Sequence, residues 1–328
     1  MPVFASSLRR LCSSIPSPWV GWLAALAAAL IGSGWQLASR HGVTTTLGPV
    51  ELAVLRYAIP ALVLAPLWLR RSGWPAGLSY RRCALLVLCG GLPFGLVVLA
   101  GAQWAPAAHM GIFVAGSLPV FTALGGWLVS GERPAPSRLL GLALIVVGMA
   151  VFGAAGWRTV EGTWRGDLLF LLAALLWSVY TLAFRSSGLT PWQGAAVVNL
   201  GSALLLLPVL LVAGAPRLLS APWSDVAWQA LGQGVAAGLL GLVVYSVAIA
   251  RLGPARAALS AALVPLLTAA GGAWLLGEPL SGALLATVLL VVPGLALGSG
   301  ALVQRLRAFQ PCPEGASKRS QSRRKAQP

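Results

Sequence analysis

The sequence predicts an all-α, polytopic membrane protein with ten transmembrane helices arranged as two inverted five-helix repeats. The composition, a duplicated motif and the placement of basic residues together predict this fold class. Hydrophobic residues make up 58% of the 328 residues, charged residues only 9%, and the mean hydropathy is +0.83. Because so few polar groups cannot cover a water-soluble globule, the chain belongs in a bilayer.

Apolar stretches of about 20 residues, long enough to cross a hydrocarbon core of about 30 Å as helices, recur along the chain. Lipid offers no hydrogen bonds to the backbone, so helix is the expected form of each stretch. We expect ten spans, with approximate centres at Leu30, Ile59, Phe94, Leu118, Val147, Leu175, Leu204, Leu240, Leu266 and Leu290.

A fourteen-position pattern occurs twice, 146 residues apart. The two copies begin at Pro119 and Pro265, share a Thr, an Ala and a Gly pair, and end in Gly-Glu at Glu132 and Glu278. Earlier in each half, several residues of one segment match the other at an offset of 145, ending with Arg40 and Arg185. A constant internal period marks a repeated structural unit.

The repeat period divides the chain into four parts. We expect a cytoplasmic N-terminal tail at residues 1–18, repeats at 19–156 and 165–303, and a basic, disordered cytoplasmic tail at 304–328. Five crossings per repeat insert the second copy upside down, which places Glu132 inside and Glu278 outside. Inverted repeats with a site near the midplane between them are typical of secondary transporters, although a duplicated bundle without transport is the alternative.

The basic residues test this topology independently of hydropathy, because cytoplasmic loops carry an excess of Lys and Arg. With a cytoplasmic N-terminus, eighteen of the 23 basic residues fall on the inner side. Arg56 lies within a span, and the outer side holds only Arg40, Arg158, Arg165 and Arg217. The charge of +16 is therefore a topology signal that favours contact with anionic membrane lipids over nucleic acid.

The segments at 102–152 and 248–298 resemble the two EamA-type domains of the drug/metabolite transporter superfamily. The resemblance extends over about residues 19 to 303. It implies ten helices with both ends cytoplasmic, alternating access, and a central cavity lined by helices 1, 3, 4, 6, 8 and 9. The segment around Arg56 also resembles the Arg-bearing second helix of the family's first repeat. The second repeat departs there, with Val198 and Asn199 in the corresponding place.

Arg56 is the one clear ionisable residue inside a predicted span. Such residues are costly in lipid and commonly functional. Arg56 could provide a counter-charge for a substrate carboxylate, or it could extend to the outer surface or brace the bundle. Both interpretations stay open at this stage.

Aromatic residues on matched helices suggest an apolar pocket with a few polar groups, the usual composition of a small-molecule site. Trp and Tyr also form interfacial belts, which is the alternative interpretation. The predicted substrate-binding residues are Trp35, Arg56, Phe94, Ser117, Thr122, Trp177, Ser178, Tyr180, Tyr245 and Thr268.

Matched bends and close packing are expected in the fourth helix of each repeat, because Pro removes a backbone hydrogen bond and Gly removes a side chain. The predicted hinge or packing residues are Pro119, Gly125, Gly126, Pro265, Gly271 and Gly272. Small-residue patterns such as Gly294-x-x-x-Gly298 suit helix packing, and a homodimer through this one is left open.

Other function classes find little support in the sequence. Both lysines, Lys318 and Lys325, lie in the tail, so no Gly-x4-Gly-Lys phosphate loop exists. No metal site or cofactor is predicted, and His41 and His109 with span-end carboxylates do not form an enzyme site. We expect a non-ATP-driven carrier in a bacterial inner membrane that exports an amino acid or similar neutral or zwitterionic compound. A multidrug or organic-cation efflux carrier, a membrane enzyme and a lipid-binding scaffold are the alternatives.

Overall fold

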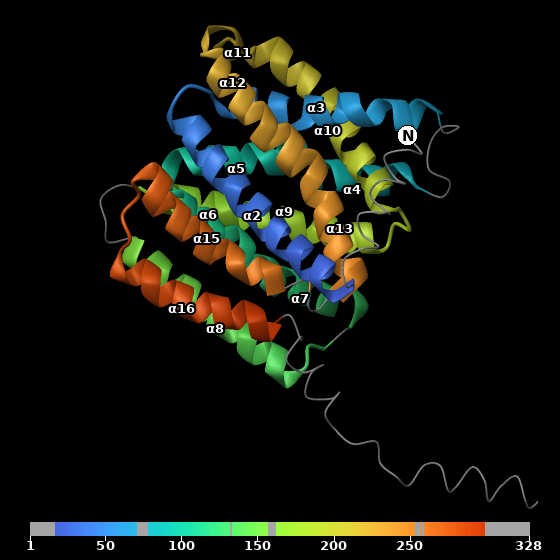
Figure 1. Cartoon of the computed structure of the whole chain (residues 1–328). Helices are drawn as coiled ribbons and strands as arrows, with labels where there is room; N and C mark the ends of the chain where they lie inside the picture. Colours follow the sequence, from blue (N-terminus) through green and yellow to red (C-terminus); the bar gives the residue numbers. More distant parts are fainter. Residues whose placement is uncertain are drawn as a thin grey trace, which may run out of the picture.

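The computed structural model describes residues 17–70, 78–131, 133–156, 162–252, 257 and 259–298. Within these residues every regular element is helical, and the helices form one bundle (Figure 1). The elements are α2 (Ser17–Thr44), α3 (Pro49–Arg70), α4 (Tyr80–Gly90), α5 (Leu92–Trp104), α6 (Ala107–Met110), the π-helix η1 (Gly111–Ala115), α7 (Gly116–Ser130), α8 (Pro136–Gly156), α9 (Trp164–Arg185), α10 (Pro191–Ala213), α11 (Arg217–Ser220), α12 (Trp223–Gln229), the π-helix η2 (Ala230–Leu240), α13 (Gly241–Leu252), α15 (Leu259–Leu276) and α16 (Gly282–Gly298).

Eight helices of the described residues are long and apolar enough to cross a membrane, and three of these join shorter elements, at Tyr80–Trp104, Ala107–Val129 and Trp223–Tyr245. Two further apolar helices, Ser260–Leu276 and Gly282–Gly298, are shorter. All ten predicted span centres fall inside these helices. The structure thus supports a multi-pass membrane protein, and the count of ten crossings stays a prediction.

The two halves of the chain exchange matching contacts. Helices α5 and α7 pack against α9, whereas α13 and α15 pack against α2. The glycines of the duplicated pattern contribute directly, because a Cβ at Gly125 would meet Leu182 and a Cβ at Gly271 would meet Leu37. Leu37 and Leu182 are themselves 145 residues apart, so the same contact occurs twice between the halves.

Helices α8 and α16, which occupy equivalent places in the two repeats, run in opposite directions. Helices α8 and α16 lie together at one edge of the bundle, and α3 and α10 at the opposite edge (Figure 1). On α8, Gly141 faces the backbone of Gly294 and Gly298, whereas Gly148 faces Leu290 on the same partner helix. The numbering rises on α8 as it falls on α16, so this pair is antiparallel.

That contact occupies the motif for which a homodimer was left open, since Gly294 already faces α8 within this chain. A homodimer through another face stays a prediction.

Bends at Pro119 and Pro265 stay a prediction, and the helical forms around the two prolines differ. The π-helix η1 precedes Pro119 by one turn, where a proline leaves a carbonyl without its helical donor. Pro265 lies inside α15, which is assigned as α-helix throughout its length. The third helices differ as well, because α4 and α5 are separated at Gly91 whereas η2 and α13 are continuous.

Both copies of the Gly-Glu motif end a helix in the same way. Gly131 ends α7 with φ +67°, and Gly277 follows α15 with φ +66°. Left-handed backbone suits glycine because it has no Cβ, and this geometry is a common helix C-cap. Glu132 and the tail at 304–328 lie outside the described residues.

Candidate substrate-binding site

Four aromatic side chains from three helices form a continuous cluster in the bundle. Phe94 on α5 is buried at the centre, with its ring centroid 4.7 Å from Trp177 on α9 and 6.3 Å from Trp35 on α2. Tyr180 extends the cluster, since its ring lies 4.8 Å from Trp177. The aromatic cluster, defined as Trp35, Phe94, Trp177 and Tyr180, therefore joins the two halves.

The interruption between α4 and α5 positions Phe94 within this cluster. The Tyr57 hydroxyl donates to the Gly91 carbonyl at 2.7 Å, and the Leu92 N–H donates to Ser202 Oγ at 2.9 Å. Backbone groups freed by a helix break inside a membrane need such partners. Side chains from α3 and α10 thus stabilise the break at Gly91.

Arg56 lies directly beside the aromatic cluster. Its guanidinium carbon is 4.3 Å from the Trp35 ring centroid and 5.7 Å from that of Tyr57, both within cation–π range. Within the described residues, its buried Nε and Nη1 have no hydrogen-bond partner. A guanidinium with free N–H groups is suited to bidentate binding of a carboxylate.

Gln233 is a site residue that the sequence reasoning missed. Its side chain is fully buried in η2, where Oε1 accepts from Trp35 Nε1 at 2.8 Å and Nε2 donates to Ser39 Oγ at 3.0 Å. Gln229, one turn earlier, donates to the Ala38 carbonyl at 2.8 Å. The available signal was two amides four residues apart in an apolar segment, a spacing that places them on one helix face.

The other predicted site residues lie apart from the aromatic cluster or bond elsewhere. Ser117 donates to Met149 Sδ at 3.1 Å, Thr122 donates to its own helix at Leu118, and Thr268 donates to Gln36 Oε1 at 2.9 Å. Ser178 is buried on α9, and Tyr245 on α13 is 37% exposed. The structure therefore brings together five of the ten: Trp35, Arg56, Phe94, Trp177 and Tyr180.

One end of the bundle carries contacts between ionisable side chains of the two halves. We call it the Glu278 end, where α2 and α5 end, α6 and α9 begin, and Glu278 follows α15. Glu278 lies 3.3 Å from Arg40 and accepts from the Ala107 N–H at 2.9 Å, while Arg40 also donates to the Ala102 carbonyl at 2.6 Å. His109 Nδ1 lies 2.7 Å from Asp167 Oδ1.

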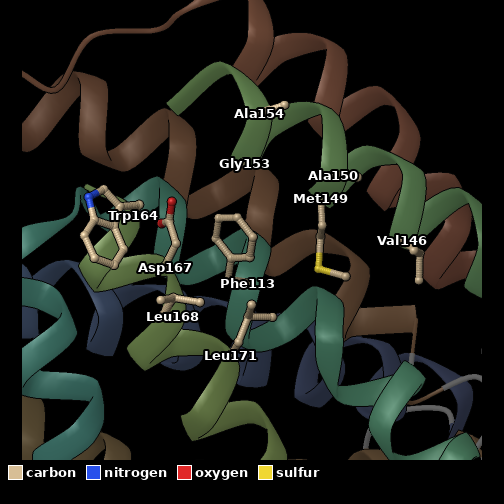
Figure 2. A pocket seen from close by; sticks show the side chains of 10 residues that line it. All are labelled: Phe113, Val146, Met149, Ala150, Gly153, Ala154, Trp164, Asp167, Leu168 and Leu171. Carbon is tan, nitrogen blue, oxygen red and sulfur yellow. The ribbon is translucent and has the colours of Figure 1, made fainter. Parts of the chain in front are cut away.

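Two hollows border this end of the bundle. A lateral groove of about 740 Å³ is bordered by Phe113 and Asp167. Figure 2 shows α8 along one side of it and α9 along the other. A second hollow of about 270 Å³ lies beside His109 and Glu278. None of the ten predicted site residues borders either hollow.

Among the described residues, a helical bundle with several helices able to span a membrane and with two interlocked halves has an architecture found in many secondary transporters. The chain belongs to the EamA-like transporter family, whose model matches residues 19–154 and 164–299. The two matches correspond to the duplication seen in the sequence, and they confirm the resemblance stated from its motifs.

Individual relatives agree with the family assignment. An uncharacterised protein of Pseudomonas aeruginosa is 33% identical over 258 residues, covering 77% of this chain and 85% of the relative. The uncharacterised transporter YvbV of Bacillus subtilis is 27% identical over 265 residues, covering 78% and 80%. One solved crystal structure has the same fold, with a TM-score of 0.58, 23% identity, and coverage of 90% of this chain and 99% of the other.

Proposed function

We propose that the protein is a secondary transporter that moves a small metabolite with a carboxylate and an apolar part, such as an amino acid or a similar zwitterion. The observation that carries the proposal is Arg56, a cation whose buried Nε and Nη1 lack partners in the described residues. It stands 4.3 Å from Trp35, at the edge of the aromatic cluster. A carboxylate would bind the guanidinium while the apolar part contacts the rings.

Alternating access between the halves is the proposed mechanism. The antiparallel pair α8 and α16 and the exchanged contacts of Gly125 and Gly271 support two halves that can rock about a shared site. A bound solute favours closure only through better contacts in the closed state. No nucleotide enters this mechanism.

The orientation and direction are part of the same proposal. The excess of Lys and Arg in alternate loops supports cytoplasmic termini in a bacterial inner membrane, which puts the Glu278 end on the outer side. The inter-half contacts at that end would close the outer side, so the site would load from the cytoplasm and the solute would leave by export.

An organic-cation efflux carrier is the second candidate, and the ring contacts of Phe94, Trp177 and Tyr180 favour it. Aromatic faces attract cations. Arg56 would repel such a cargo, so removing its charge would raise cation flux and lower acid flux. The two candidates therefore predict opposite signs for the same variant.

The test begins with an untargeted metabolite comparison of cells with and without the protein, followed by flux of the identified acid and its amide in liposomes. For Arg56→Ala we expect acid flux to fall by roughly 30-fold or more, the loss of a charge-assisted pair, and amide flux to change far less. Arg165→Ala is the matched control, because Arg165 also stacks on a tryptophan, 4.9 Å from Trp104, but is exposed. Equal losses for acid and amide, with lower thermal stability, would assign Arg56 to bracing the bundle.

A further inference from the structure

Four ionisable side chains at the Glu278 end form two pairs that connect the halves. Arg40 pairs with Glu278 at 3.3 Å, and His109 pairs with Asp167 at 2.7 Å. Arg40 and His109 belong to the first half, and the two carboxylates belong to the second. The His109 and Asp167 side chains are only 13% and 8% exposed, so their charges are poorly hydrated.

Within these two pairs the charges balance only when His109 is protonated. Arg40 neutralises Glu278, and within the described residues His109 is the ion-pair partner of Asp167. The neighbouring elements α5, η1, α15 and α16 carry no ionisable side chain, and the single one on α8, Arg138, lies near the opposite end of its helix. Arg165 on α9 instead stacks on Trp104 and Trp164.

Water has a route to His109. The hollow of about 270 Å³ is lined by His109, Thr163 and Glu278 and reaches the exposed residues Leu280 and Ser281. Thr163 Oγ1 is buried there without a hydrogen-bond partner in the described residues. Buried polar atoms without a protein partner are normally satisfied by water, and a hollow of this size holds several molecules at about 30 Å³ each.

The geometry also specifies which nitrogen would take the proton. Nδ1 faces the Asp167 carboxylate at 2.7 Å and, because a carboxylate only accepts, Nδ1 is the donor. Nε2 is therefore the atom that gains or loses a proton. Asp167 borders the lateral groove, as Figure 2 shows, whereas His109 borders the smaller hollow, so each hollow is in contact with one member of the pair.

We propose that His109 and Asp167 form a proton-binding site that controls closure of the Glu278 end. With a proton on Nε2 the buried cluster is neutral and the halves are held together. Loss of that proton leaves an uncompensated carboxylate in a poorly hydrated place, which favours separation and hydration of this end. Histidine is suited to this role because its ordinary titration lies near neutral pH. Acid therefore closes this end and alkali opens it.

The test measures hydrogen–deuterium exchange of the full chain in lipid nanodiscs, and it needs no solute. Peptides covering residues 101–112 and 162–170 are compared at pH 5.5 and pH 8, after correction for the intrinsic pH dependence of exchange. We expect these peptides to exchange several-fold faster at pH 8, with a limit of about tenfold per pH unit because a single proton is linked. Both pH values lie above the ordinary range of an aspartate, about 3.9.

Variants test whether His109 and Asp167 cause the pH difference in hydrogen–deuterium exchange. His109→Gln should abolish the pH difference, and Asp167→Asn should abolish it too, because no carboxylate then needs a counter-charge. His41→Gln is the matched control, since the other histidine is exposed at the end of α2, and it should keep the wild-type difference. A wild-type protein without the difference, or His109→Gln with the full difference, would overturn the proposal. If His109→Gln does not elute as folded protein, the Asp167→Asn result decides in the same way.

Discussion

The two halves share a backbone plan but differ in the chemistry of their matched positions. Arg56 in the first half is a cation with buried N–H groups that lack partners among the described residues. In the second half, Val198 and Asn199 stand in the corresponding place, and the Asn199 side chain donates to the Ala195 carbonyl of its own helix at 2.9 Å. The Arg56 N–H groups are thus available to a ligand, whereas the Asn199 side chain already has a hydrogen-bond partner in its own helix.

The third helices show the same contrast in the backbone. Tyr57 and Ser202 stabilise a break between α4 and α5, whereas η2 stays continuous in a π-helical form and carries Gln233. A π-helix inside a longer helix is often found at a functional site. Both solutions turn a side chain towards Trp35, Phe94 from one half and Gln233 from the other.

The largest expected effect concerns the contact between α8 and α16, to which each half contributes one helix. Gly148 on α8 and Gly294 on α16 are repeat mates, by which we mean residues at equivalent positions of the two repeats. A Cβ at Gly294 would lie 2.8 Å from the Gly141 carbonyl oxygen. Gly294→Leu should lower the stability of the bundle by about 3 kcal/mol or more, because backbone cannot move aside as a side chain can. Thermal unfolding in detergent measures this loss. Gly282→Leu is the control, since open space surrounds that Cβ, and an equal loss there would contradict the packing argument.

The next effect separates the repeat mates Arg40 and Arg185. Arg40→Ala removes the ion pair with Glu278 and the bond to the Ala102 carbonyl, which should cost about 2 kcal/mol for a partly buried charged group. Arg185 is exposed at the other end of the bundle, so Arg185→Ala should cost about 0.5 kcal/mol or less. Exchange of the 101–112 peptide should rise only in Arg40→Ala. Unchanged exchange in that variant would show that the pair does not close the Glu278 end.

A smaller effect distinguishes Trp35 from its repeat mate Tyr180. Trp35→Phe keeps an aromatic ring, although a smaller one, and leaves Oε1 of the fully buried Gln233 without its 2.8 Å donor, which should cost about 1 to 2 kcal/mol. Tyr180→Phe should cost about 0.5 kcal/mol or less, since within the described residues its hydroxyl has no hydrogen-bond partner. Solute-free thermal unfolding compares the two. Equal losses of stability in the two variants would mean that the hydrogen bond between Trp35 and Gln233 adds no stability beyond that of ring packing.

The smallest effect should be the same in both halves. Gly131 and Gly277 both have left-handed φ and open space around the Cβ position, so alanine meets only backbone strain. Gly131→Ala and Gly277→Ala should each cost about 1 kcal/mol. Matching shifts in Tm would confirm that the two caps are equivalent. A difference larger than the measurement error would show that their surroundings decide the cost.

Much of the architecture could be predicted from the sequence, because a lipid environment requires helices and the duplication requires equivalent helices and contacts in the two repeats. The ten span centres fall inside helices, and Gly125 and Gly271 meet equivalent leucines. Arg56 and the aromatic residues Trp35, Phe94, Trp177 and Tyr180 also gather as a group. Large aromatic side chains on adjacent inner helices commonly pack against each other.

Other features depended on the rotation of each helix, which an almost uniformly apolar sequence does not specify. Tyr245 is partly exposed, and Ser117 bonds to Met149 rather than joining the aromatic cluster. The pairing of His109 with Asp167 links residues 58 positions apart in different halves. A hydropathy pattern without a polar face gives the position of a helix along the chain and leaves its facing residues undetermined.

The sequence by itself determined the membrane environment, the duplication, and the family to which the chain belongs. These follow from composition and periodicity, which are properties of the chain before it folds. The tertiary structure decided that Gln233 holds Trp35, that Gly91 interrupts a helix, and that two ion pairs connect the halves at the Glu278 end. These depend on which helix faces meet, and in a bundle this apolar only the packing of small and large side chains fixes those faces.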